Sequence, residues 1–294
     1  MTFEAAMNLS SQVTLILFTS EGREHLLNAS YPSFLTYNTF IFYETLLAID
    51  GPFDLNAVPT VKPDRILQQC LRKGYISSIQ NALAAVKTPY FFWLEDDFIF
   101  HREAPVAYML SVLADPGWAG LFLSRSAPLV ESDKRVQYAD DLYLMNIGFS
   151  VSPSLCNTET VKAAFAALAA SPKDESTRRM GFETFIDGYF VKNGYKYAVV
   201  DPGAEAHVTH AGHLESTPRE YHMINSIDPE LSDIDKFYLS GLGKEGEISL
   251  YNKLAMLPKL WYATWVLTYK LFRSRKAYDF AFRIYRGFLR GFRF

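Results

Sequence analysis

The sequence predicts an α/β fold in which helices flank a mostly parallel β-sheet. Short apolar runs alternate with stretches of helical periodicity along residues 13–200. Several runs end at acidic or turn-forming residues, as the run 89–94 does at Glu95, Asp96 and Asp97. The composition, 49% hydrophobic and 21% charged over 294 residues, is that of a globular chain and argues against disorder.

The first half of the chain supplies three of the expected strands. The elements are a strand at 13–19, a helix at 23–36, a strand at 40–49, helices at 63–73 and 76–86, and a strand at 89–94. Each strand is a short apolar run, and turn sequences at 20–22 and 50–52 end the first two. The first helix is expected despite Pro32, and Gly74 separates the other two.

The second half continues the alternation. The elements are a helix at 104–114, a strand at 120–123, a polar loop at 124–141, a strand at 147–151, helices at 158–170 and 182–193, and a strand at 195–200. Pro105 suits the first turn of its helix, and Asn157 or Thr158 caps the next one. Gly194 ends the last helix. Strands that alternate with helices in this way indicate a mostly parallel sheet.

Cysteine usage and hydropathy narrow the protein class. Cys70 and Cys156 have the spacing of neither a disulfide framework nor a zinc ribbon, so we expect buried apolar fillers in a reducing compartment. Residues 1–12 lack the basic start and apolar core of a secretory signal. No uncharged apolar stretch of membrane-spanning length occurs, and we therefore expect a cytosolic chain that does not cross a membrane.

The C-terminal segment differs from the rest of the chain in charge. Residues 248–294 contain ten Lys and Arg against one acid, Asp279, although the whole chain has a net charge of −3. Aromatic residues lie between these cations, as in interfacial helices on anionic membranes. A helix packed on the main domain would explain the same pattern, and a nucleic-acid surface is similar in composition, although we expect no nucleic-acid partner. These observations predict a main domain at 1–243 and a helical, basic aromatic extension at 244–294.

Glu95, Asp96 and Asp97 form the strongest candidate site. Their oxygens suit hard cations such as Mg²⁺ or Mn²⁺, which can hold a diphosphate. The triplet could instead supply a general base, or form an acidic cap or solvated turn without chemistry. Strand alternation predicts that Glu95 and Asp97 point to one side and Asp96 to the other.

Two further sets of residues could carry chemistry. His207, His210 and His213 lie within seven residues, just beyond the last predicted strand. A loop there could bring one imidazole to a cation held by Asp97, whereas a lone histidine is more often structural. Glu183 begins a helix, where it is either a cap favoured by the helix dipole or a general base near an acceptor hydroxyl.

Taken in order, these segments resemble inverting glycosyltransferases of the GT-A fold, most closely glycosyltransferase family 2. The resemblance covers residues 13–213. Segments 77–83 and 88–97 are similar to the family's helix, strand and Asp-x-Asp sequence, with Glu95 in place of the first Asp. Segment 181–183, followed by Gly194 and Tyr195, is similar to the family's Glu-Asp segment and Gly-Tyr pair, with Phe182 and Glu183 where the family has Glu and Asp.

The resemblance implies a role for each matching residue. Glu183 falls on the catalytic base, and Asp97 on the ligand of a Mn²⁺ or Mg²⁺ ion, with His207 and His210 as competing further ligands. The residues implied to bind the nucleotide-sugar are Thr19, Glu21, Arg23, Asp50, Asn81, Glu95 and Asp96. Asp50 at the end of the second strand would contact the base or ribose.

The implied activity is inverting, metal-dependent transfer of a sugar from a UDP- or GDP-type donor. The acceptor hydroxyl would belong to a glycan or a lipid-linked precursor, because the basic aromatic extension indicates a location at the inner face of the cell membrane. Two alternatives use the same residues. One is a metal-dependent hydrolase or nucleotidyltransferase, and the other is a non-catalytic membrane-associated protein with an inert acidic triplet.

Overall fold

The computed structural model describes residues 11–211 except 126, 130, 132–133, 147 and 172–180. The strands are β1 (Val13–Ser20), β2 (Glu44–Asp50), β3 (Arg65–Gln69), β4 (Tyr90–Glu95), β5 (Phe98–Phe100), β6 (Trp118–Leu123), β7 (Lys134–Ala139), β8 (Leu142–Met145), β9 (Ser154–Asn157), β10 (Lys196–Val200) and β11 (Val208–His210). The helices are α2 (Glu24–Tyr37), α3 (Tyr75–Ala85), α4 (Val106–Leu113), α5 (Thr158–Ala169) and α7 (Phe182–Lys192), with a 3₁₀ turn at Leu55–Ala57.

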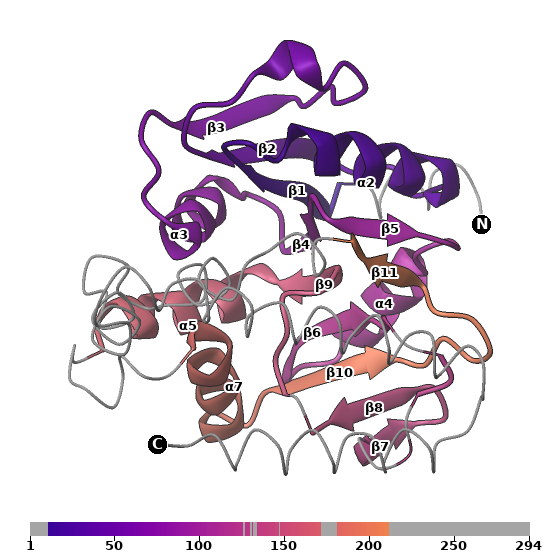
Figure 1. The fold of residues 1–294 in the computed structure, drawn as a ribbon. Helices are drawn as coiled ribbons and strands as arrows, with labels where there is room; N and C mark the ends of the chain where they lie inside the picture. Colours follow the sequence, from indigo (N-terminus) through magenta and orange to yellow (C-terminus); the bar gives the residue numbers. More distant parts are fainter. Residues whose placement is uncertain are drawn as a thin grey trace, which may run out of the picture. The chain divides into compact units, whose positions relative to one another are not determined.

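Within the described residues, nine strands form one sheet in the order β3-β2-β1-β4-β9-β6-β10-β8-β7 (Figure 1). Strand β1 pairs in parallel with β2 and with β4, and β2 pairs in parallel with β3. Strands β6 and β10 are also parallel. Strand β9 is antiparallel to both β4 and β6, and β8 is antiparallel to both β10 and β7. Strands β8 and β9 therefore run against all the others, and the mostly parallel sheet expected from the sequence is confirmed.

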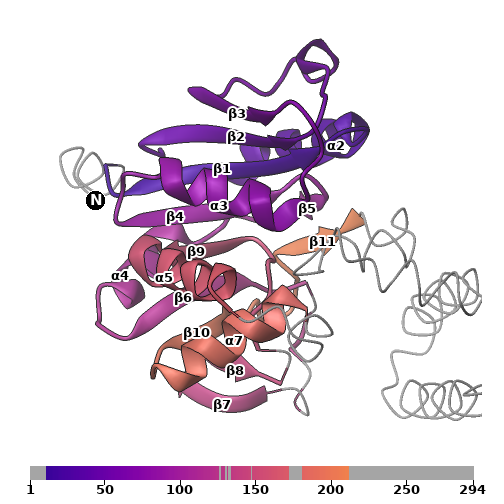
Figure 2. The ribbon, with the colours of Figure 1, turned by 90° about the vertical axis from the view of Figure 1, so that its left-hand side faces the viewer.

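Helices cover both faces of this sheet. Helices α2 and α4 pack on one face, and α3, α5 and α7 pack on the other (Figure 2). Alternate side chains of β4 enter the two apolar layers, with Phe92 and Leu94 toward α2 and Phe91 and Trp93 toward α3. Burial of each such side chain contributes roughly 1.5–3 kcal/mol. A strand buried on both faces explains why 89–94 is apolar without a break.

The carboxyl edge of the sheet collects the ends of several elements. Strands β1, β2 and β4 end there, with Ser20 opposite Asp50 and Phe18 opposite Glu95 in the register. A helix that leads into a parallel strand starts at this edge, because it crosses back over the sheet before the strand begins. Helix α3 leads into β4 and α7 into β10. The starts of these helices therefore lie at the edge where β4 ends.

The helix predicted at 63–73 is wrong, because Arg65–Gln69 forms strand β3. Its side chains alternate between more and less exposed positions, which is the period of a strand. The strand pairs in parallel with β2, from Arg65 opposite Leu46 to Gln69 opposite Asp50. A partner strand remote in sequence outweighed the local helical pattern.

The strand predicted at 147–151 is also wrong. The strand of this region is β9, and it starts after Pro153, which has no N–H to donate to a ladder. Within 147–151, Gly148 has φ +64°, a conformation outside the β region. The polar loop predicted at 124–141 contains strand β7, which pairs with β8. The other elements expected between 13 and 200 are present, with ends shifted by a few residues.

Three expectations concern the cysteines and the C-terminal segment. Cys156 is buried as expected, but Cys70 is exposed and does not fill a core position. The boundary predicted after residue 243 and the extension at 244–294 lie outside the described residues. Among the described helices, none combines the length and hydropathy that crossing a membrane requires.

Candidate functional site

The three acidic side chains leave the end of β4 in different directions. Glu95, the last residue of β4, contacts Tyr75 of α3, whereas Asp96, the first residue of the following turn, contacts Thr19 of β1, and the predicted opposition of these two residues is confirmed. Asp97 lies in a turn beyond the last strand residue. The strand alternation therefore does not apply to Asp97, whose contacts are made with Arg23 and His210.

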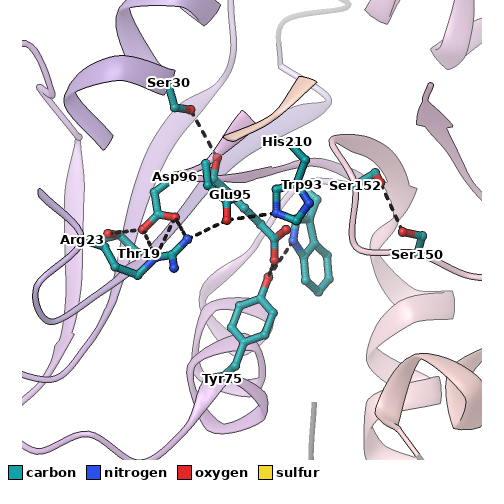
Figure 3. Close-up of polar contacts among 11 residues, drawn as sticks. Thr19, Arg23, Ser30, Tyr75, Trp93, Glu95, Asp96, Ser150, Ser152 and His210 are labelled. Atoms are coloured by element: carbon teal, nitrogen blue, oxygen red, sulfur yellow. Dashed lines mark hydrogen bonds and ion pairs between the residues drawn. The ribbon is translucent and has the colours of Figure 1, made fainter. Parts of the chain in front are cut away.

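Asp96 anchors the turn that follows β1. Thr19 donates its hydroxyl hydrogen to Asp96 at 2.7 Å, and Arg23 donates from Nε and Nη2 to the same carboxylate at 2.6–3.0 Å (Figure 3). Both oxygens of Asp96 therefore have donors. Charge-assisted, two-pronged contacts of this kind are the strongest that a carboxylate makes. Thr19, Arg23 and Asp96, all expected at a nucleotide site, are joined in one network.

Asp97 connects this network to a histidine. Its Oδ2 accepts from Arg23 Nη2 at 2.7 Å and lies 3.1 Å from His210 Nε2. Burial opposes ionisation, but the hydrogen bond and charge of His210, together with Arg23, hold the pKa of Asp97 below its usual value. Its Oδ1 is buried and has no hydrogen-bond partner among the described residues. An ionised oxygen without a donor is a natural contact for a cation or a ligand hydroxyl.

His210 is placed by the pairing of β11 with β5, in which it lies opposite Phe98. Its ring stacks on Phe98 with centroids 4.6 Å apart and an interplanar angle of 8°. The amide of Ala211 donates to the carbonyl oxygen of Asp97 at 2.8 Å. Backbone and ring contacts therefore fix the imidazole against Asp97.

Glu95 points away from this pair, toward the start of α3. The hydroxyl of Tyr75 donates to Glu95 Oε1, and Trp93 Nε1 donates to Tyr75 at 3.1 Å (Figure 3). Burial, and then the charge of Asp97, raise the pKa of Glu95 well above its usual value. The charge of Glu183 acts in the same direction.

Glu183 lies in the first turn of α7 and does not cap that helix. Its Oε1 instead accepts from the amide of Val151 at 2.9 Å. Burial raises the pKa of Glu183, whereas the Val151 hydrogen bond and the charges of Arg125 and His210 oppose this rise. One turn later, Asp187 accepts from the amide of Phe149 at 3.1 Å. Two carboxylates on one side of α7 thus hold the loop that enters β9.

Three other predicted residues differ in how the structure holds them. Both oxygens of Asp50 accept backbone hydrogens, from Lys73 at 2.7 Å and from Gly74 at 3.0 Å. Glu21 is exposed, and its side chain lies against Gly51. Asn81 is exposed on α3, nearly two turns after the helix begins. Among these residues, Asp50 has a defined role, because it fixes the loop that leads into α3.

His207 is set apart from Asp97. Its side chain is buried, and Nδ1 has no partner among the described residues. Burial, followed by the charge of Arg102, lowers the pKa of His207 to about 4, and Asp201 opposes this shift. His207 precedes strand β11, and its carbonyl oxygen accepts from the amide of His101 at 3.0 Å, whereas His210 lies inside that strand and contacts Asp97. His213 lies outside the described residues.

Tyr75 and Asp187 belong to the site but are not among the residues expected from the sequence. The sequence around Gly74 predicts a break between two helices, although glycine also occurs as the N-cap residue directly before a helix. Asp187 follows Glu183 by four residues, the spacing that places two side chains on one helix face. That spacing was the available signal. The backbone donors in the loop before β9 became visible only in the structure.

The described residues offer a divalent ion few protein ligands. Across the part of the chain that the structure describes, no three His, Cys, Asp or Glu side chains are grouped as a metal site. Asp97, with its unpaired Oδ1, and His210 form a pair. Magnesium sites in nucleotide enzymes commonly use one or two carboxylates and complete their coordination with water and substrate phosphates. The residues present fit that kind of site better than an all-protein cage.

Comparison with known proteins gives structural likeness without sequence likeness. No protein-family model matches the chain, and no curated protein matches it. S. aureus TarS aligns at a TM-score of 0.50 and 14% identity over 80% of this chain and 46% of the TarS chain. CMP:2-keto-3-deoxy-manno-octonic acid synthetase, solved with CTP, aligns at 0.44 and 14% identity over 66% of this chain and 90% of that one.

This chain spans less than half the length of the TarS structure. At 14% identity the likeness to TarS shows the fold alone. The fold class predicted from the sequence, an α/β fold of the GT-A type with a mostly parallel central sheet between helices, is confirmed.

Proposed function

We propose that this protein transfers a sugar from a nucleoside-diphosphate donor to an acceptor hydroxyl, with inversion at the anomeric carbon. One observation carries the proposal, namely the convergence of Asp97, His210, Glu95 and Glu183 at one sheet edge from separate segments. Asp97 contacts His210, and Tyr75 contacts both Glu95 and Phe182, the neighbour of Glu183 in the chain. In open α/β sheets this edge is where ligands bind.

The charge of the site supports a cation-dependent donor. A diphosphate placed beside the ionised Asp97 would be repelled, and Arg23 is the cation seen in direct contact with Asp97. Asp97 and His210 would hold the proposed Mn²⁺ or Mg²⁺ ion. When bound, this ion would supply positive charge against the departing diphosphate. Arg23, which is kept protonated by Asp96 and Asp97, would add a second positive group at the same end of the donor.

Glu183 is the proposed general base. A base for a hydroxyl must be a carboxylate or imidazole whose pKa lies close to the working pH. Burial moves the pKa of Glu183 upward, in the required direction. The amide of Val151 fixes one of its oxygens, so the carboxylate has a defined orientation. Removal of the acceptor proton by Glu183 while the donor bond breaks on the opposite side gives inversion.

The acceptor is proposed to be a glycan or a lipid-linked precursor at an anionic membrane surface. Support comes from the ten Lys and Arg interleaved with aromatic residues in 248–294. Replacement of Arg273, Arg275 and Lys276 by Ser in the full chain should weaken binding to phosphatidylserine vesicles relative to neutral ones. Equal binding of both proteins to both kinds of vesicle would remove the membrane part of the proposal.

The donor proposal is tested by nucleotide binding followed by turnover. Thermal melts with UDP, GDP or CDP should show stabilisation by at least one nucleotide, and MnCl₂ should increase it. A panel of nucleotide-sugars scored for release of the diphosphate then identifies the donor. Release of a nucleoside monophosphate and pyrophosphate from a nucleoside triphosphate would instead identify a nucleotidyltransferase. Absence of any nucleotide effect would favour a non-catalytic protein.

A further inference from the structure

Tyr75 contacts Glu95, which is assigned to the donor, and Phe182, which precedes the proposed base Glu183. The proposed mechanism gives Tyr75 no role. Its hydroxyl accepts from Trp93 Nε1 at 3.1 Å and donates to Glu95 Oε1. This relay ties the first carboxylate of the triplet to a tyrosine 20 residues earlier in the chain. A glutamate with three rotatable side-chain bonds is thereby held in one orientation. Figure 3 shows Tyr75 directed from α3 toward the end of β4.

The backbone before Tyr75 is fixed by another predicted site residue. Gly74 precedes α3 with φ +92°, which a residue with a side chain rarely adopts. The amides of Lys73 and Gly74 both donate to Asp50 at the end of β2. Asp50 therefore sets where α3 begins, and with it the position of the Tyr75 ring.

The ring of Tyr75 packs against three aromatic residues from different elements. It makes edge-to-face contacts with Phe18 of β1, Trp93 of β4 and Phe182 of α7, at centroid distances of 5.7, 6.3 and 6.0 Å. Phe182 directly precedes Glu183 in the chain. Aromatic pairs in this geometry favour a defined mutual orientation. The ring thus helps to seat the start of the helix that carries the proposed base.

We propose that Tyr75 is a positioning residue with two separable parts. Its hydroxyl orients Glu95 for contact with the nucleotide, and its ring orients the start of α7 and hence Glu183. This inference rests on the proposed function, because it assigns Glu95 to the donor and Glu183 to the acceptor. Loss of the hydroxyl is expected to lower nucleotide affinity, and loss of the ring is expected to lower kcat as well. A role in stability alone would not separate these two effects.

The first test removes the hydroxyl and keeps the ring. Tyr75→Phe in the full chain should weaken binding of UDP or GDP with MnCl₂ about tenfold in calorimetry, since the hydrogen bond that orients the buried Glu95 carboxyl is lost. The kcat at saturating donor should change by less than about threefold, because the ring still seats α7. Wild-type affinity in Tyr75→Phe would overturn the inference.

The second test asks whether Tyr75 acts through Glu95. Glu95→Ala should weaken nucleotide binding, and Tyr75→Phe added to Glu95→Ala should weaken it no further. A general packing role would give the same loss in both backgrounds and would contradict the proposal. Tyr75→Leu, which removes the ring as well, should lower kcat in addition to affinity. An unchanged kcat in a folded Tyr75→Leu protein would refute the role assigned to the ring.

Failure of the proposed function is distinguishable from failure of this inference. If the wild-type chain binds no nucleoside diphosphate with MnCl₂, both ideas fall together. If the wild type binds and turns over donor while Tyr75→Phe behaves identically, the function stands and the inference alone is wrong.

Discussion

His210 Nε2 lies 3.1 Å from Oδ2 of Asp97, although 113 residues separate the two in the chain. The antiparallel pairing of β11 with β5 makes this contact, since it sets His210 opposite Phe98 next to Asp97. The same carboxylate receives Arg23 from the turn after β1. Asp97 is therefore the point at which three distant segments meet.

Asp97→Asn tests this meeting point. The substitution keeps the shape of the side chain but removes the charge that a divalent ion and His210 require. We expect the apparent affinity for UDP or GDP in the presence of MnCl₂ to fall at least about tenfold. Glu159→Gln is the matched control, because Glu159 is an exposed acid on α5. Equal metal dependence in wild type and Asp97→Asn would exclude Asp97 as the ligand.

Glu183→Gln tests the general base. Gln keeps an oxygen that can accept from Val151 but cannot take a proton from a hydroxyl. The kcat should fall by roughly 10²–10⁴, while the affinity for the nucleotide stays within about threefold of wild type. A loss confined to nucleotide affinity would place Glu183 at the donor instead.

Gly148→Ala tests the contacts between α7 and the loop before β9. An added Cβ would lie 2.5 Å from the Asp187 carboxylate, and Gly148 has φ +64°. We expect a loss of about 1–3 kcal/mol in unfolding free energy, measured in urea, and lower activity because Val151 and Glu183 shift.

Gly188→Ala is the control for that experiment. Gly188 lies within α7, and nothing approaches its added Cβ within 4 Å. The substitution should raise stability by roughly 0.5–1 kcal/mol, because alanine loses less entropy in a helix. Destabilisation by both substitutions would mean that α7 itself is intolerant of change, which would contradict the specific contact argued for Gly148.

His207 predicts the acid sensitivity of the fold. Its pKa in the folded chain is about 4, below the usual 6.5, so the unfolded chain gains the proton first as the pH falls. The contribution of His207 is fully present above pH 6.5, declines between pH 6.5 and 4, and amounts to about 3 kcal/mol. In His207→Leu, the urea midpoint of unfolding should vary less with pH over this range. Equal slopes in the wild type and in His207→Leu would contradict the buried neutral state.

The sequence predicted the site well where local periodicity was sufficient. Alternation along an apolar strand correctly predicted that Glu95 and Asp96 have different partners. It did not extend to Asp97, the second residue of the turn after β4, which shares Arg23 with Asp96. It also failed at 65–69, where pairing with β2 formed a strand out of a segment that resembled a helix. In both cases the deciding contact lay outside the window over which periodicity can be read.

By itself the sequence determined that helices and strands alternate, that most strands run parallel, and that carboxylates stand at their ends, because these properties follow from hydrophobic period and turn residues. Tertiary structure alone decided which groups meet. The register of β11 on β5 selected His210 over His207, the turn after β1 brought Arg23 to Asp97, and the start of α3 delivered Tyr75 to Glu95. Register depends on pairing between distant strands, and a slip of one residue reverses which side chains face the site.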